Sequence, residues 1–115
     1  MKRENRLKKN KQFAYIYKNG KPVFSNHINL IYIKSKYKPL KVGFSVSKKI
    51  GKSVVRSKVK RRLSESFRHM MPFVNQNYNY VFIAKSGIEN LSYWEINSEI
   101  KSLITRAGLY DEKNC

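Results

Sequence analysis

The chain has 115 residues, 41% of them hydrophobic and 13% aromatic, and its formal net charge is +18. This is enough apolar material for one small folded domain, which excludes a disordered basic tail. No stretch approaches the roughly 18 apolar residues of a membrane span, and no apolar segment follows the charged first ten residues, as it would in a secretory signal. We therefore expect a single cytoplasmic domain over residues 1–115. The one cysteine, Cys115, excludes an internal disulfide and predicts a frayed terminal thiol.

Positive charge is concentrated in the first part of the chain. Residues 1–64 carry 20 lysines and arginines and one acid, Glu4, whereas residues 65–115 carry five basic and six acidic residues. A surface that only keeps a protein soluble mixes both signs. A block of one sign and this length is typical of a surface that binds a polyanion, most often nucleic acid. A membrane surface is the weaker alternative, because the apolar positions described below are needed for a core.

The first helix is predicted just after a basic N-terminal segment. Residues 1–9 are expected to form a mobile basic arm, and Asn10 is a candidate cap for a helix over residues 11–18. The helix is expected to end at Asn19–Pro22, because glycine and proline interrupt helices. Three apolar residues fall on one of its faces: Phe13, Ile16 and Tyr17.

Three strands are predicted next. A short one covers residues 23–25, and residues 28–34 (INLIYIK) favour a second strand because they are rich in β-branched and aromatic side chains. A turn is expected at residues 36–39. Residues 41–47 alternate between apolar and small side chains, which predicts a third strand with one buried face.

A long helix is expected over residues 53–71, with Ser53 as its N-cap. Its apolar residues recur every four positions and form one buried stripe, Val55, Val59, Leu63 and Phe67.

A fourth strand and a last helix complete the predicted fold. Residues 78–84 favour a strand, and Ser92 with Glu95 forms a capping box that begins a helix ending near Gly108. The element order αβββαβα predicts the α+β class, as a two-layer sandwich of helices on a small sheet.

The titratable side chains do not suggest catalysis by the protein itself. The two histidines, His27 and His69, lie in different predicted elements. Metal-dependent phosphodiester cleavage needs clustered carboxylates, and six of the seven acids lie outside the basic part of the chain. A self-sufficient metal-dependent nuclease is therefore a weaker alternative than an RNA-binding protein.

The strongest functional signal is the segment 48–62, KKIGKSVVRSKVKRR, in which eight of fifteen residues are basic. It covers a strand end, a loop and the first turns of the predicted helix, whose free N–H groups also favour phosphate. RNA suits this mixture, because its folded surface presents phosphates and 2′-hydroxyls. The candidate RNA-binding cations are Lys48, Lys49, Lys52, Arg56, Lys58, Lys60, Arg61 and Arg62.

Aromatic residues form a second candidate group. They lie on the first helix and on the predicted strands: Phe13, Tyr17, Tyr32, Phe44, Tyr80 and Phe82. Most rings at such positions pack in a core. A ring left exposed in a cleft between the helix and the sheet would instead stack an unpaired nucleobase.

Two stretches, NRLKKNKQFAYIYKNGK and KVGFSVSKKIGKSVVRSKVKRRLSESFR, resemble the protein subunit of bacterial ribonuclease P, and the similarity extends over nearly the whole chain. The family's RNR motif, R-N-R-x-x-K-R, corresponds to residues 56–62, RSKVKRR. Ser57 stands where the family usually has asparagine, and Lys58 where it usually has arginine. A hydroxyl replaces only part of an amide's hydrogen bonding, and lysine lacks the guanidinium fork.

The resemblance implies both a fold and a function. The family's small mixed sheet contains two parallel strands joined by a left-handed βαβ crossover around the basic helix, although general rules favour a right-handed one. In the family, a catalytic RNA subunit removes the 5′ leader of precursor tRNA with Mg²⁺, which is bound mainly by the RNA. The protein is the accessory subunit of this endonuclease and contributes no catalytic or metal-binding residue. No obligate protein partner is expected.

The resemblance also implies specific contacts. The leader is expected in a cleft between the first helix and the sheet, at Phe13, Tyr17 and a strand residue, for which Tyr32 is our candidate and Ile31 an alternative. We also assign Lys48 and Lys49 to leader binding. Contacts to the catalytic RNA are expected at Lys52, Arg56, Lys58, Lys60, Arg61 and Arg62.

A ribosomal-type structural RNA-binding protein without turnover is the main alternative. It would share the charge and the small α+β fold. An exposed aromatic cleft beside the basic helix would distinguish the two functions.

Overall fold

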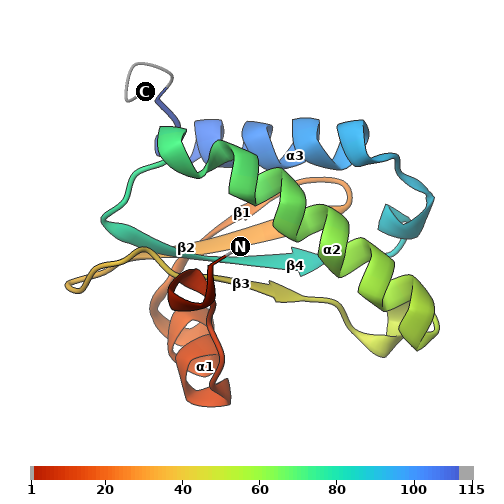
Figure 1. The fold of residues 1–115 in the computed structure, drawn as a ribbon, viewed down its shortest axis with the longest axis horizontal. Coiled ribbons are helices and arrows are strands. Elements are labelled where there is room, and N and C mark those ends of the chain that lie inside the picture. The colour runs from red at the N-terminus through yellow and green to blue at the C-terminus, as the bar shows by residue number, and fades with distance from the viewer. Residues whose placement is uncertain (1, 112–115) are drawn as a thin grey trace.

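The computed structural model describes residues 2–111, so Cys115 lies outside the described residues (Figure 1). The helices are α1 (Asn10–Asn19), α2 (Ser53–Met70) and α3 (Tyr93–Arg106), and the strands are β1 (Lys21–Phe24), β2 (Ile28–Lys34), β3 (Val42–Ser45) and β4 (Tyr78–Ala84). The predicted order αβββαβα is confirmed. None of the helices among residues 2–111 has the length and hydrophobicity of a membrane span.

The four strands form one mixed sheet in the order β1-β2-β4-β3. Strand β2 is antiparallel to both β1 and β4, whereas β3 is parallel to β4. Helix α2 lies in the connection from β3 to β4, where the family resemblance predicts the crossover. The handedness of that crossover stays a prediction. Strands β1 and β3 are the two edges of the sheet.

The predicted α+β class with a small mixed sheet is confirmed, and helices cover both faces of that sheet rather than one. Helices α2 and α3 pack on one face and α1 on the other (Figure 1). The reason lies in β4, whose side chains are apolar on both faces: Tyr80 and Phe82 join the main core with α2 and α3, and Val81 joins the smaller core with Ile16 of α1. A central strand that is apolar on both faces needs a cover on each.

The N-terminal segment is docked on the domain at Asn5 and Leu7, two residues of the expected mobile arm, whereas the mobility of the exposed residues beside them stays a prediction. The side-chain amide of Asn5 donates a hydrogen bond to the Leu40 carbonyl at 2.7 Å, and the Leu7 N–H donates to the Val42 carbonyl at 3.0 Å. Asn5 and Leu7 are both buried. A single leucine within a basic segment is the sequence signal for this docking.

Two of the three predicted helix caps are wrong. Asn10 and Ser53 are the first residues of their helices rather than the caps before them. At α1 the Gln12 side chain accepts hydrogen bonds from the backbone of the preceding residues instead. The capping box of α3 is confirmed, because Ser92 Oγ accepts from the Glu95 N–H at 3.2 Å and the Glu95 carboxylate accepts from the Ser92 N–H at 2.9 Å.

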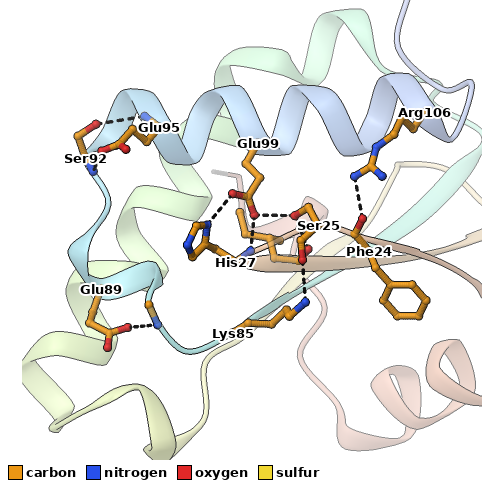
Figure 2. Close-up of polar contacts among 11 residues, drawn as sticks. Phe24, Ser25, His27, Lys85, Glu89, Ser92, Glu95, Glu99 and Arg106 are labelled. Atoms are coloured by element: carbon orange, nitrogen blue, oxygen red, sulfur yellow. Dashed lines mark hydrogen bonds and ion pairs between the residues drawn. The ribbon is translucent and has the colours of Figure 1, made fainter.

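A carboxylate of α3 fixes the turn between β1 and β2 (Figure 2). One oxygen of Glu99 accepts hydrogen bonds from Ser25 Oγ at 2.5 Å and from the His27 N–H at 2.8 Å, and the other lies 3.0 Å from His27 Nδ1. Lys85 Nζ donates to the Ser25 carbonyl at 2.7 Å. Burial raises the pKa of Glu99, but the hydrogen bonds from Ser25 and His27 outweigh it and leave this pKa below its usual value.

We expect Glu99→Gln to lower the free energy of unfolding at neutral pH by about 2 kcal/mol, because the hydrogen bonds to a charged group disappear. The lowered pKa means that the carboxylate stabilises the fold above its unfolded-state pKa, and that this contribution disappears as the pH falls through the folded-state pKa. Urea denaturation from neutral pH to about pH 3 measures both effects. The exposed Glu4→Gln is the control, and equal stability of Glu99→Gln and the unmodified protein at neutral pH would contradict the prediction.

Candidate RNA interface

The basic segment presents most of its cations to solvent. The apolar stripe of α2 is buried as predicted at Val59, Leu63 and Phe67, which turns the polar side of the helix outward. The exposed cations come from α2, from the residue before it and from the 3₁₀ turn after β3, and they are Lys48, Lys49, Lys52, Lys58, Lys60 and Arg61. The predicted positive surface therefore exists.

Two arginines of this segment, Arg56 and Arg62, are half-buried, and Arg62 is bonded to the fold. Arg62 Nη1 donates a hydrogen bond to the Leu91 carbonyl at 2.7 Å and so holds the chain just before α3. The Nε of Arg56 is buried and has no hydrogen-bond partner among the described residues. These two side chains are less available to RNA than the six exposed cations.

A cleft of about 300 Å³ lies between α1 and α2, over the edge strand β3. It brings together residues that are far apart in the sequence, since Phe13 comes from α1, Gly43 from β3, and Lys60 with Arg61 from α2. The remaining lining residues are Arg6, Leu7, Val42, Phe44, Ser57, Ser64 and Glu65. An aromatic ring and two cations thus face one cleft beside the basic helix.

The ring of Phe13 lies directly on the backbone of β3. A Cβ atom at Gly43 would come within 2.5 Å of both Cε1 and Cζ of this ring, so only glycine permits the contact. Phe13 is half-buried and packs against the smaller core. The ring of Tyr17, one helical turn further, lies 6.3 Å away between centroids, and Tyr17 is 43% exposed. Tyr17 is therefore free to contact a ligand, whereas Phe13 also holds α1 in place.

The prediction that Tyr32 lines the cleft beside α1 is wrong. Side chains alternate along a strand, and Tyr32 packs against the main core on the α2 and α3 side, with its ring 5.9 Å from that of Tyr78. Ile31 faces α1 instead, as part of the smaller core. The alternative residue, Ile31, lies on the α1 face of the sheet but does not line the cleft, so its contact with the leader stays a prediction.

Sequence reasoning missed six residues of the cleft, which are Arg6, Leu7, Val42, Gly43, Ser64 and Glu65. Gly43 carried a usable signal, because a glycine inside a strand often marks the close approach of another group. Arg6 and Ser64 carried none, since their positions depend on the docking of the N-terminal segment and on the rotation of α2.

The acidic residues near the cleft do not form a metal site. Among residues 2–111 no group of three or more histidine, cysteine, aspartate or glutamate side chains could hold a metal ion. Glu65 pairs with Arg68 at 3.0 Å, and the hydrogen bond from Arg68 lowers the pKa of this carboxyl. The cleft lining, which is a ring with cations and hydroxyls beside the Glu65 carboxylate that Arg68 pairs, suits binding of a nucleic acid strand.

Comparison with known proteins decides the family. The family model described as Ribonuclease P matches residues 1–108. The chain belongs to the ribonuclease P protein family. It is 43% identical to the ribonuclease P protein component of Clostridium beijerinckii, over 94% of this chain and 92% of that protein. It is 46% identical to the one from Clostridium kluyveri, over 91% and 96% of the two chains.

Solved structures agree with this assignment. The ribonuclease P protein of Staphylococcus aureus has a TM-score of 0.86 and 27% identity, over 93% of this chain and 98% of that one. The protein from Thermotoga maritima has a TM-score of 0.80 over 88% and 96% of the two chains, and at 24% identity it supports the fold. The function is thus that of a protein component in a tRNA-processing ribonucleoprotein endonuclease, and the ribosomal alternative is not favoured.

We expect Gly43→Ala to lower the free energy of unfolding by about 1–3 kcal/mol, because the new methyl group displaces the ring of Phe13 from β3. Chemical denaturation measures the change. Ser45→Ala, at the next position on the same face of β3, is the matched control and is expected to have a smaller effect. An unchanged stability of Gly43→Ala would contradict the observed seating of Phe13.

Proposed function

We propose that the chain binds two RNAs, the catalytic RNA on the exposed side of α2 and the 5′ leader of precursor tRNA in the cleft between α1 and α2. The observation that carries this proposal is that Phe13, Lys60 and Arg61 line the same cleft at the edge strand β3. An RNA strand in this cleft would have the ring of Phe13 on one side and the cations of Lys60 and Arg61 on the other.

The cleft suits a single strand whose sequence varies. Any nucleobase stacks on an aromatic ring, with a gain of about 1–3 kcal/mol per base, and the exposed ring of Tyr17, which lies beside Phe13 outside the cleft lining, would extend such contact. Lys60 and Arg61 would bind the phosphates from the opposite wall. Lys48 and Lys49, exposed just beyond β3, would continue the backbone contacts. This mode of binding accepts leaders of different sequences.

The catalytic RNA would contact the outer side of α2 and the residues before it. Lys52 and Lys58 are exposed there, and a helix N-terminus attracts phosphate. Lys60 and Arg61 lie at the border between this surface and the cleft, so the two RNAs would meet at them. Lys58 offers a point charge where arginine would offer a fork, which favours phosphate contact over bidentate recognition.

The chain itself would bind and orient the RNAs rather than cut them. We assign the Mg²⁺ of the reaction mainly to the catalytic RNA, in keeping with the finding that among residues 2–111 no group of three or more histidine, cysteine, aspartate or glutamate side chains could hold a metal ion. We also propose a cytoplasmic location, in keeping with an RNA partner and a single cysteine. The protein's contribution is then to raise the affinity for substrates that still carry a leader.

The first test concerns the salt dependence of binding to the catalytic RNA. We expect Lys60→Ala/Arg61→Ala to weaken binding and to reduce the slope of log affinity against log salt by about 0.7–0.9 for each phosphate that the variant no longer neutralises. Filter binding at several salt concentrations measures this slope.

A variant of equal charge provides the control. Lys101→Ala/Arg106→Ala also removes two positive charges, but from α3, and is expected to change the slope less. Equal salt-dependence slopes for the two double variants would show that net charge alone governs binding. The cations of α2 would then not contact the RNA more than those of α3.

The second test concerns the leader. We expect Tyr17→Ala to weaken binding of precursor tRNA to the holoenzyme about fivefold or more, through loss of base stacking, and to leave the affinity for mature tRNA unchanged. Phe13→Leu keeps the packing on β3 but removes the ring, and the same pattern is expected. Trp94→Ala removes an exposed ring on α3 and is the control. An equal loss for both tRNAs would place the leader elsewhere.

A further inference from the structure

A second groove, of about 520 Å³, lies on the other flank of α1. Residues on a helix are spaced by about 100° around its axis. Around the buried Ile16, Phe13 and Tyr17 therefore lie on one flank, and Gln12 and Tyr15 on the opposite one. The second groove is formed by this opposite flank, by β2 and by the loop between β2 and β3, which projects from the end of the sheet (Figure 1). We call it the Tyr15 groove.

Two exposed tyrosines from different elements line the Tyr15 groove. Tyr15 of α1 is 61% exposed and Tyr37 of the β2–β3 loop is 81% exposed. The groove also has an apolar side, formed by Leu7, Ile16 and Ile33. The fold does not need these two rings for its core, because they contribute little buried area. They are available as stacking platforms.

The rest of the lining is positive or neutral. Four lysines line the groove, and no carboxylate does: Lys11, Lys34, Lys36 and Lys41. A polyanion is therefore favoured over a cation or a neutral apolar ligand. The combination of exposed rings with lysines is the one that proteins use to bind single-stranded nucleic acid without sequence preference. Paired bases in a duplex would not reach these rings, because they are stacked on their neighbours.

The Tyr15 groove is continuous with the cleft along the N-terminal segment. A third hollow, of about 720 Å³, is lined by Gln12 and Lys41, which it shares with the Tyr15 groove, and by Arg6, which it shares with the cleft. Its other lining residues are Lys2, Arg3, Glu4, Lys8 and Lys9. An RNA strand that leaves the cleft at Arg6 would therefore lie along a mostly positive surface that extends to Tyr15.

We propose that the Tyr15 groove is a second binding site for single-stranded RNA, in which Tyr15 and Tyr37 stack bases and the four lysines bind phosphates. The site is separate from the cleft, so its binding of single-stranded RNA to the protein alone does not depend on what the cleft binds. Its role in the holoenzyme, which is to receive the part of a long 5′ extension that lies beyond the cleft, rests on the proposed function.

The direct test uses the full-length protein alone and a fluorescent oligouridine of about ten nucleotides, a length within the range that such sites accommodate. Tyr15→Ala/Tyr37→Ala is expected to raise the dissociation constant about tenfold or more, as expected for the loss of stacked bases. Trp94→Ala, which removes a ring that is 73% exposed on α3, is the control and is expected to have no effect. Melting temperatures confirm that each variant is folded.

Crosslinking identifies the site independently of affinity. With 5-iodouridine in the oligonucleotide, crosslinked peptides containing Tyr15 and Tyr37 are expected, and they are expected to persist in the Tyr17→Ala background. Absence of these peptides, together with an unchanged affinity of the double variant, would overturn the proposal. The proposal would also be overturned if Lys34→Ala/Lys36→Ala weakened binding of the oligonucleotide but Tyr15→Ala/Tyr37→Ala did not. The same holds if a polyglutamate peptide of equal length bound as tightly as the oligonucleotide.

Leader length separates this site from the cleft in the holoenzyme. For precursor tRNAs with leaders of about 4 and about 20 nucleotides, Tyr15→Ala/Tyr37→Ala is expected to weaken binding of the long-leader substrate only, whereas Tyr17→Ala weakens both. An equal effect of the groove variant on both substrates would contradict the second site and leave the proposal for the cleft intact. No effect of Tyr17→Ala would contradict the cleft and leave the second site intact.

Discussion

The burial of β4 on both faces is the constraint on which the rest of the structure depends. Tyr80, Val81 and Phe82 are all fully buried although they point in alternate directions. The strand therefore needs an apolar cover on each side, and α2 with α3 supplies one and α1 the other. Because α1 and α2 lie on opposite faces, they flank the same edge strand, β3. The cleft at that edge is a consequence of how β4 is buried.

The placement of the positive charge on the surface follows from the same arrangement. Helix α2 commits its apolar stripe to the core, so its lysines and arginines have to point outward or along the rim of the cleft. Cations gathered on one surface repel one another and oppose the compact state. An RNA bound there would offset this repulsion. Binding the polyanion and stabilising the domain are then two results of one electrostatic interaction.

Helix α1 has one buried residue that fixes it on the sheet and two flanks that face different parts of the surface. Ile16 is buried against the sheet and fixes the rotation of the helix. That rotation turns Phe13 toward the cleft, with Tyr17 on the same flank outside the cleft lining, and Tyr15 toward the opposite groove. The close seating of Phe13 on Gly43 fixes how near α1 approaches β3. A helix of ten residues therefore shapes two surfaces that could bind nucleic acid.

Much of the local structure was predictable because it depends on neighbouring residues. The apolar stripe of α2, the capping box at Ser92 and Glu95 and the four strands follow from periodicity and short-range hydrogen bonding. The caps predicted at Asn10 and Ser53 failed for a local reason as well, since each helix begins one residue earlier than a cap at these positions requires.

By itself, the sequence determined the element order, the positive surface of α2 and the family resemblance, since each depends on spacing or composition along the chain. Only the tertiary structure decided which side of the sheet each strand residue faces. Because side chains alternate along a strand, Ile31 and Tyr32 must point to opposite faces of the sheet. Both faces are apolar, so the sequence pattern does not tell which of the two residues packs toward α1. The docking of Leu7 and the bond from Arg62 to Leu91 are likewise contacts between distant segments, and such contacts exist only once the chain is folded.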